Sequence, residues 1–133
     1  MSLATNLACL QQFGFLGMHS FDNMAALNAN SQSLATRLFC RICRVVTSVG
    51  TGSVVLPAQL TGENDQFPCV LINDSPNSLN LFPAAGETIN ALGANASIAV
   101  AAGKTALCVA NDVPPAHGGV ATGSNLNWVV MIG

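Results

Sequence analysis

From residue 39 onward, the sequence alternates short β-forming runs with clusters of turn residues. The runs are rich in valine, isoleucine and leucine, and they are separated by glycine, proline, asparagine and aspartate. This pattern is typical of a sandwich or barrel, and the absence of helix-length periodic segments between the runs argues against a βαβ fold. We therefore predict an all-β domain over 37–133, an antiparallel β-sandwich or jelly roll. Its expected strands are 39–49, 53–58, 67–73, 79–82, 87–92, 97–101, 105–110 and 126–132.

The first 36 residues differ in composition and are rich in alanine, leucine, asparagine and glutamine. Leu3, Leu7 and Leu10 follow the i, i+4, i+7 spacing of a short amphipathic helix, although glycines interrupt it further on. Asp22 is a candidate N-cap of a second helix. The sequence therefore predicts a partly helical N-terminal arm over 1–36. Such an arm cannot bury its apolar side alone, so we expect it to dock on its own domain or on a neighbour.

Charged residues make up 8% of the 133 residues, whereas half of the residues are apolar. An ordinary soluble domain is about 25% charged, and a monomer with so few charges would struggle to stay dispersed. No window reaches the roughly 18 to 20 uninterrupted apolar residues of a membrane-spanning helix, so we expect no membrane contact. The composition predicts an obligate oligomer or a subunit of a larger assembly, whose interfaces replace the missing polar surface.

The net charge is −2, and the four basic residues are Lys104 and a cluster of Arg37, Arg41 and Arg44. Tight general binding of nucleic acid rests on many phosphate contacts from lysine and arginine. A cluster of three arginines is too short to track a duplex. We therefore expect no direct contact with nucleic acid.

The sequence contains five cysteines, mostly embedded in apolar runs: Cys9, Cys40, Cys43, Cys69 and Cys108. An odd number does not match the even framework of a secreted disulfide scaffold. We expect small, buried, reduced thiols in a protein assembled inside a cell. Cys40 and Cys43 form a C-x-x-C, but no second pair accompanies it, and positions i and i+3 of a strand face opposite sides. We expect neither a metal site nor a redox site there.

The stretch around Gly103-Lys104-Thr105 ends like a phosphate-binding loop. That motif requires a glycine five residues before Gly103, where this chain has Ile98, and it must lead into a helix. The residues that follow are β-forming instead. The stretch therefore predicts a hairpin turn with Gly103 at its tip and Lys104 as an exposed contact.

The other polar side chains do not form a recognisable catalytic or metal-binding motif. A hydrolase could use His117 with Asp112 as its orienting acid, but no G-x-S-x-G elbow is present. The six acidic residues are scattered over turns, without the spacing of a calcium loop. We expect no catalytic residue, no bound metal and no cofactor.

The final predicted strand is apolar on both of its faces. Trp128, Val130 and Ile132 alternate onto one face, whereas Val129 and Met131 fall on the other. The strand is therefore expected to be sandwiched or to lie at the centre of a subunit interface.

Several motifs follow one another between residues 70 and 110. An asparagine ends a strand at Asn73, L-x-L-F-P-x-x-G-x-x-I-N follows from Leu79, G-A-N-A-S-I follows from Gly93, and A-A-G-K-T-A precedes a closing tryptophan strand. This order resembles a β-rich module of tailed-bacteriophage virion proteins, found in head-decoration (cement) proteins, fibres and tail components. The resemblance covers about a third of the chain. It implies a non-enzymatic structural protein of a phage particle.

The chain is short and has no heptads or collagen-like repeats, which favours a small decoration protein over a long fibre. Such a protein is commonly trimeric, sits on the capsid surface, and stabilises the phage head by bridging capsid subunits. The expected partners are other copies of the chain, in a homotrimer, and the major capsid protein of the same particle, with assembly in the host cytoplasm. The alternatives are a tail- or fibre-associated adaptor or knob, and a carbohydrate-binding or small hydrolytic β-module that uses the loop of His117.

The residues that we expect at interfaces are apolar side chains of the arm together with basic and aromatic residues of the β domain: Leu3, Leu7, Leu10, Phe13, Phe15, Arg37, Arg41, Lys104, His117 and Trp128.

Overall fold

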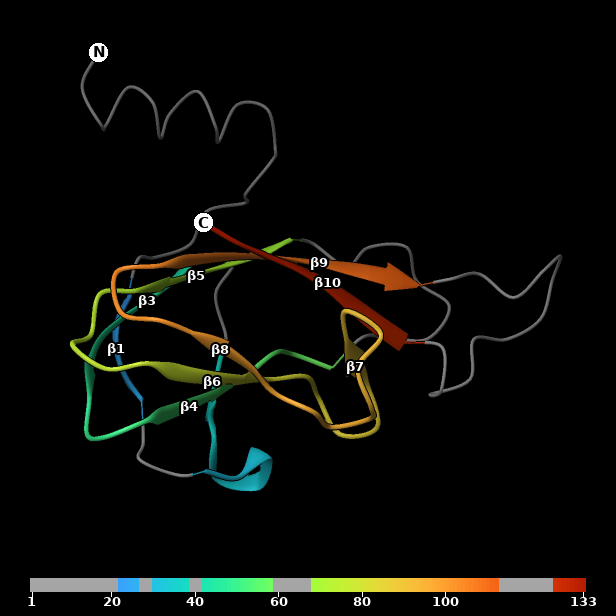
Figure 1. Cartoon of the computed structure of the whole chain (residues 1–133), viewed down its shortest axis with the longest axis horizontal. Coiled ribbons are helices and arrows are strands. Elements are labelled where there is room, and N and C mark those ends of the chain that lie inside the picture. The colour runs from blue at the N-terminus through green and yellow to red at the C-terminus, as the bar shows by residue number, and fades with distance from the viewer. Residues whose placement is uncertain (1–21, 27–29, 39–41, 59–67, 113–125) are drawn as a thin grey trace, which may run out of the picture.

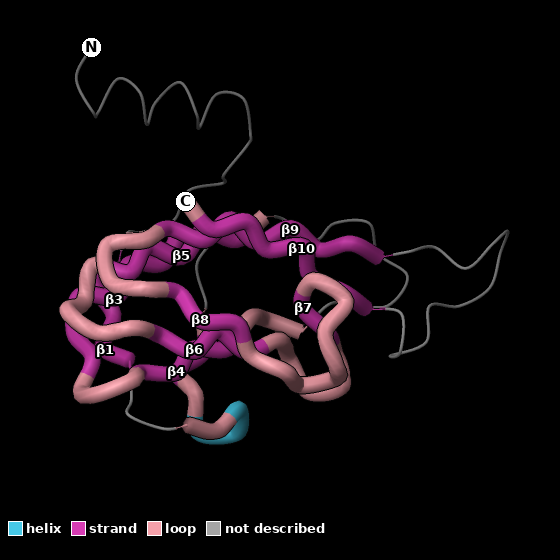
Figure 2. Tube along the Cα trace, in the orientation of Figure 1, coloured by secondary structure: helices cyan, strands magenta, loops and turns pink. Residues whose placement is uncertain are grey.

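A computed structural model describes residues 22–26, 30–38, 42–58, 68–112 and 126–133, and these segments are all-β (Figures 1 and 2). Their one helical element is a short 3-10 helix, η1 (Gln32–Leu34), and none of their helices is long and apolar enough to cross a membrane. The described strands are β1 (Asp22–Ala26), β2 (Thr36–Arg37), β3 (Ile42–Ser48), β4 (Gly52–Val55), β5 (Cys69–Asn73), β6 (Leu79–Phe82), β7 (Thr88–Ile89), β8 (Ile98–Val100), β9 (Thr105–Asp112) and β10 (Leu126–Ile132).

The strands form two mixed sheets. Sheet A has the order β1-β3-β5-β9-β10-β7, and sheet B has the order β2-β4-β6-β8. The first six strands alternate between the two sheets. The pairs β1/β2, β3/β4 and β5/β6 therefore form three successive layers of a stack, which we call rungs. Within the stack, β1, β3 and β5 run parallel in sheet A, and β2, β4 and β6 run parallel in sheet B.

The chain reverses direction after the third rung. β8 lies antiparallel to β6 in sheet B, and β9 lies antiparallel to β5 in sheet A. β10 then pairs antiparallel with β9 and carries the short β7 on its other side, in parallel. The fold is therefore a parallel three-rung stack joined to an antiparallel half, and the β5–β9 and β6–β8 pairs are the joints between them.

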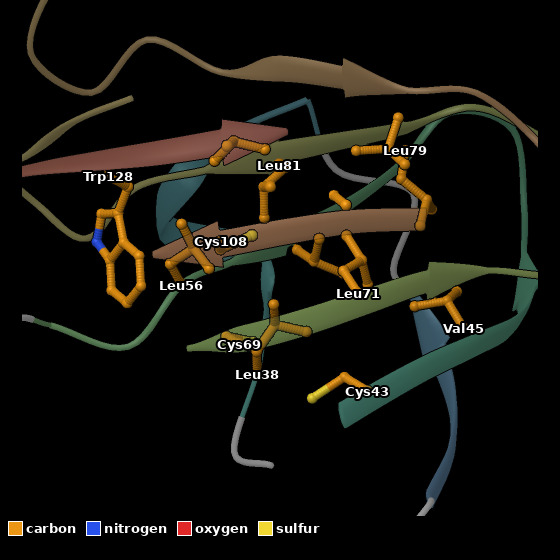
Figure 3. Close-up of a cluster of buried hydrophobic side chains, with 14 of the residues drawn as sticks. Leu38, Cys43, Val45, Leu56, Cys69, Leu71, Leu79, Leu81, Cys108 and Trp128 are labelled. Atoms are coloured by element: carbon orange, nitrogen blue, oxygen red, sulfur yellow. The ribbon is translucent and has the colours of Figure 1, made fainter. Parts of the chain in front are cut away.

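The hydrophobic core lies between the two sheets, and strands of both sheets contribute to it (Figure 3). Its largest fully buried side chains include Trp128, Leu71, Leu79, Leu81 and Ile89. The rungs approach so closely at Gly52 that an added Cβ would lie 2.7 Å from the Cβ of Ala26 and 2.8 Å from Cδ2 of Leu79. A glycine is therefore required there, because that space is already filled by the neighbouring strands.

A buried asparagine, Asn73, holds the end of the third rung. Its Nδ2 donates to the carbonyl oxygens of Asn77 and Val100, both at 2.9 Å. Its Oδ1 accepts from the backbone N–H of Ser75 at 3.1 Å and from the Ser75 hydroxyl at 2.6 Å. The Asn73 amide thus joins the β5–β6 turn to the end of β8 without using a charge.

The same position also fixes the turn between β8 and β9. The backbone N–H of Asn73 donates to the Lys104 carbonyl at 2.9 Å, and its carbonyl accepts from the Gly103 N–H at 2.7 Å. Ser48, which ends β3, donates through its hydroxyl to Ser75. Asn77 Nδ2 donates to the Ser48 carbonyl at 3.0 Å. Three chain connections are therefore tied together at one end of the stack.

The structure confirms a β-strand in each of the eight predicted runs, but the predicted antiparallel arrangement is wrong for most of the fold. Five of the eight strand pairings among the described residues are parallel. The physical reason is that most connections carry the chain from one sheet to the other. A strand that returns to its first sheet after such a circuit runs parallel to its predecessor.

The predicted hairpin at Gly103 is wrong for the same reason. β8 pairs with β6 in sheet B and β9 pairs with β5 in sheet A, so the turn between them joins two sheets. Gly103 does take a positive φ of 73°, as the turn requires. Its N–H bonds to Asn73 instead of closing a two-strand ladder.

The prediction that Asp22 caps a helix is also wrong, because Asp22–Ala26 is β1, the edge strand of sheet A. Met24 of this strand packs against the core. Pairing with β3 and core burial therefore override the weak helical tendency of an Asn- and Ala-containing segment. β1 and β2 place part of the predicted 1–36 arm within the sheets, whereas the helix predicted around Leu3, Leu7 and Leu10 lies outside the described residues.

We predict that Asn73→Ala lowers the free energy of unfolding by about 3 kcal/mol, because buried carbonyl and N–H groups lose their partners. Asn80→Ala is the matched control, since Asn80 makes an exposed hydrogen bond to Asn30, and we expect it to cost under about 0.5 kcal/mol. Urea unfolding followed by the fluorescence of Trp128, the single tryptophan, measures both. Equal midpoints for the two variants would contradict the role given to Asn73.

Candidate assembly surface

The outer face of sheet A carries a row of apolar side chains in register across four strands. Ile42 pairs with Val70, Val70 pairs with Leu107, and Leu107 pairs with Met131. Directly paired residues project from the same face of a sheet. Their neighbours along the chain point into the core and are buried: Cys43, Cys69, Leu71, Ala106, Cys108 and Val130. The row therefore faces away from the core.

Further apolar side chains extend this row. Val109 pairs with Val129, and Ile72 stands two residues beyond Val70 on the same side of β5. Met131 and Val129 are 52% and 37% exposed, and the other members are half-buried. We call this surface the outer apolar face, and it consists of Ile42, Val70, Ile72, Leu107, Val109, Val129 and Met131.

A sheet with one face in water normally alternates apolar and polar residues. β5 and β9 instead carry apolar residues on both faces from the Cys69–Cys108 pair to the Leu71–Ala106 pair, and β10 does so from Trp128 to Met131. Covering apolar surface contributes about 25 cal/mol per Å². The outer apolar face therefore has the composition of a surface that is covered by a partner.

One ion pair borders this face. Arg44, opposite Ile72 in the register, donates through Nε to Oδ2 of Asp74, and both side chains are partly exposed. A surface pair of this kind contributes little to stability. The Asp74 carboxylate does neutralise the charge of Arg44 at the border of the apolar face. This ion pair therefore adds no net charge that a protein covering the face would have to bury.

Most of the residues predicted for interfaces lie outside the described residues: Leu3, Leu7, Leu10, Phe13, Phe15, Arg41 and His117. Arg37 is exposed on β2 of sheet B, and Lys104 is exposed immediately before β9. These two cations therefore belong to different parts of the fold, and neither is a member of the outer apolar face.

Trp128 is fully buried, so the interface role predicted for it does not fit this fold. Its indole Nε1 donates to Oε2 of Glu87 at 2.8 Å, inside the protein. Glu87 itself is 3% exposed. The β10 side chains of the outer apolar face that are exposed to a partner are instead Val129 and Met131. The alternation of the strand predicts both of them on its second face. The row from Ile42 to Met131 could not be predicted, because it depends on the strand order.

A separate hollow of about 490 Å³ lies beside sheet B, and its lining includes Arg37, Leu38, Leu56 and Ala84. Gln32, from η1, also lines it and donates through Nε2 to the Pro83 carbonyl at 2.7 Å. One guanidinium among mostly small and apolar side chains gives this hollow no evident chemistry. Within the described segments, no group of three or more His, Cys, Asp or Glu residues could hold a metal ion.

The cysteines depart from the prediction that all of them are reduced. Cys43 is disulfide-bonded, and its partner lies outside the described residues. Cys69 and Cys108 are reduced and buried in the core (Figure 3). Burial raises the pKa of the Cys69 thiol from 9.0 to about 12. Burial, and then the neighbouring Cys69, raise the pKa of Cys108 still further.

No family model, curated protein or solved structure matches this chain.

We predict that Cys69 and Cys108 react slowly with iodoacetamide while the protein is folded. A pKa of about 12 in place of 9.0 lowers the thiolate fraction of Cys69 at pH 8 about 1,000-fold. Rates from peptide mass spectrometry, compared in native buffer and in denaturant, measure this protection. Native rates equal to denatured rates would show that the two thiols are not buried.

The same pKa changes give a pH dependence of stability. The folded-state pKa lies above the unfolded value, so the stabilisation from neutral buried thiols is complete below pH 9 and is lost as the pH rises from 9 towards 12. The free energy of unfolding should therefore fall over that range in the wild type, and less in Cys69→Ala.

Proposed function

We propose that this chain is a non-enzymatic structural protein of a bacteriophage particle, and specifically a capsid decoration protein that bridges capsid subunits. The outer apolar face is the observation that carries the proposal. It presents seven apolar side chains over four adjacent strands. A surface of this kind on a protein of low charge supports a role in protein–protein contact.

The scarcity of charge supports assembly as well. In the described residues, Arg44 is neutralised by Asp74, and Glu87 is buried against Trp128. Among the residues that the structure describes, Arg37 and Lys104 are the exposed cations outside that ion pair. Net charge and surface charge keep monomers apart in solution. A chain with so little of either is suited to a lattice in which its neighbours cover it.

The phage resemblance falls on the part of the structure that holds the fold together. Residues 70–110 run from β5 to β9 and therefore contribute strands to both sheets. They include Asn73, whose hydrogen bonds tie three connections together. The residues that resemble the virion module thus form both joints between the parallel stack and the antiparallel half.

A decoration protein acts by adding buried area across the joints between capsid subunits. A standard protein interface buries about 1,600 Å² in total. Repeated over a lattice, contacts of that size resist internal pressure without any single contact being very tight. In this proposal the chain forms a homotrimer, the outer apolar face supplies a contact to the shell or to a neighbouring copy, and the arm adds a second contact.

Shell binding by surface variants tests the proposal. We expect Met131→Lys to weaken binding to undecorated phage heads at least tenfold, because a charge would be buried in the contact. Leu92→Lys is the matched control, since Leu92 is a 44% exposed leucine in the turn after β7, and we expect wild-type binding. The unfolding midpoints of both variants should stay close to wild type.

Wild-type decoration by Met131→Lys would remove the outer apolar face from the proposal. Absence of the protein from purified particles, measured by quantitative mass spectrometry, would reject a virion role altogether. A handful of copies per particle would indicate a tail component, whereas hundreds would support decoration of the head.

A further inference from the structure

Two buried cysteines face each other across the joint between the two halves of the fold. Cys69 of β5 and Cys108 of β9 are direct partners in the antiparallel register. Neither is disulfide-bonded, and both side chains lie in the same core cluster (Figure 3). Because direct partners project from the same face of a sheet, the two thiols are neighbours.

The backbone at this pair already has a spacing that suits a disulfide. Direct partners in antiparallel strands have Cα atoms about 4.5 or 5.5 Å apart, depending on their hydrogen bonding. Disulfides span Cα separations of about 4.4 to 6.8 Å. Either kind of antiparallel pair therefore lies in the permitted range, so a bond between the sulfurs needs small side-chain movements and no change of register.

The pair is also one of the two terminal pairs of the β5–β9 ladder. The register runs from Ile72 opposite Thr105 to Cys69 opposite Cys108 and ends there, while β9 continues beside β10. The last pair of a ladder frays at lower free energy than its interior. Both sulfurs are buried, so a reagent reaches them slowly, through local opening of this end and without unfolding of the whole protein.

We propose that Cys69 and Cys108 are an oxidation site that accepts a cross-strand disulfide from a low-molecular-weight disulfide such as oxidised glutathione. The Cys69 thiolate attacks one glutathione sulfur, the glutathione S–S bond breaks, and the first glutathione leaves as a thiolate. The Cys108 thiolate then attacks the Cys69 sulfur of the mixed disulfide and displaces the second glutathione. Two protein thiols are oxidised, one glutathione disulfide is reduced, and the two protons pass to the two glutathione thiols.

The consequence is a covalent link between the parallel stack and the antiparallel half. It closes a loop of about 40 residues between positions 69 and 108, which restricts the unfolded chain. A protein assembled with both thiols reduced would gain this link on transfer to an oxidising medium, where disulfides persist. The structure already contains one disulfide, at Cys43, so oxidised cysteine is compatible with this core.

The test uses the full chain, purified without reductant and incubated with oxidised glutathione until its mass is constant. We expect a linked peptide that contains Cys69 and Cys108 and is two hydrogens lighter than the two reduced peptides together, and a rise in Tm of about 5–10 °C. Cys108→Ala, treated in the same way, is the control, and it should show no linked peptide and no rise in Tm.

Stable glutathione adducts on Cys69 without a linked peptide would overturn the proposal, because they would show that Cys108 cannot reach its partner. So would an unchanged mass after prolonged incubation. A linked peptide with an unchanged Tm would contradict the stabilising role. None of these outcomes bears on whether the protein belongs to a virion, since shell binding and copy number decide that separately.

Discussion

The fold depends on the hydrogen bonds of one buried, uncharged side chain, Asn73. A chain that passes repeatedly between two sheets must bury turn backbone at its corners, and buried N–H and C=O groups need partners. Asn73 supplies them for the β5–β6 turn and for the end of β8, while its backbone holds the β8–β9 turn. Asn90 does the same beside β10, where its side chain bonds both the N–H and the carbonyl of Val130. Side-chain amides thus replace ion pairs in a chain that has few charges.

This construction leaves sheet A apolar on both sides. Its inner face packs against sheet B through residues such as Leu71 and Trp128. Its outer face aligns Val70, Leu107 and Met131 because the register brings three different strands together. The inner face is buried within a single copy of the chain. The outer face is removed from water only when another protein covers it, and that burial is favourable. The folding of the chain and its proposed assembly therefore use opposite sides of the same strands.

The sequence predicts where the strands are better than how they pair. The β-forming runs are local signals, and eight of them became strands. Pairing direction is not local, since a turn such as the one at Gly103 looks alike within one sheet and between two. The sequence predicts a helix at Asp22–Ala26 because its Asn and Ala residues carry no local strand signal. The segment is a strand in the structure because it pairs with β3. The second face of β10 could be read from alternation, but the row through Ile42 needed the strand order. The disulfide at Cys43 could not be predicted from the spacing of the cysteines.

The central claim is that assembly covers the outer apolar face, and oxidative footprinting of Met131 tests it most directly. Met131 is 52% exposed in the single chain, so dilute hydrogen peroxide should convert it readily to the sulfoxide in the isolated protein. In intact phage particles the account predicts that oxidation of Met131 slows at least tenfold. Equal oxidation rates in the isolated protein and in the particle would show that the face stays open to water, and would contradict the account.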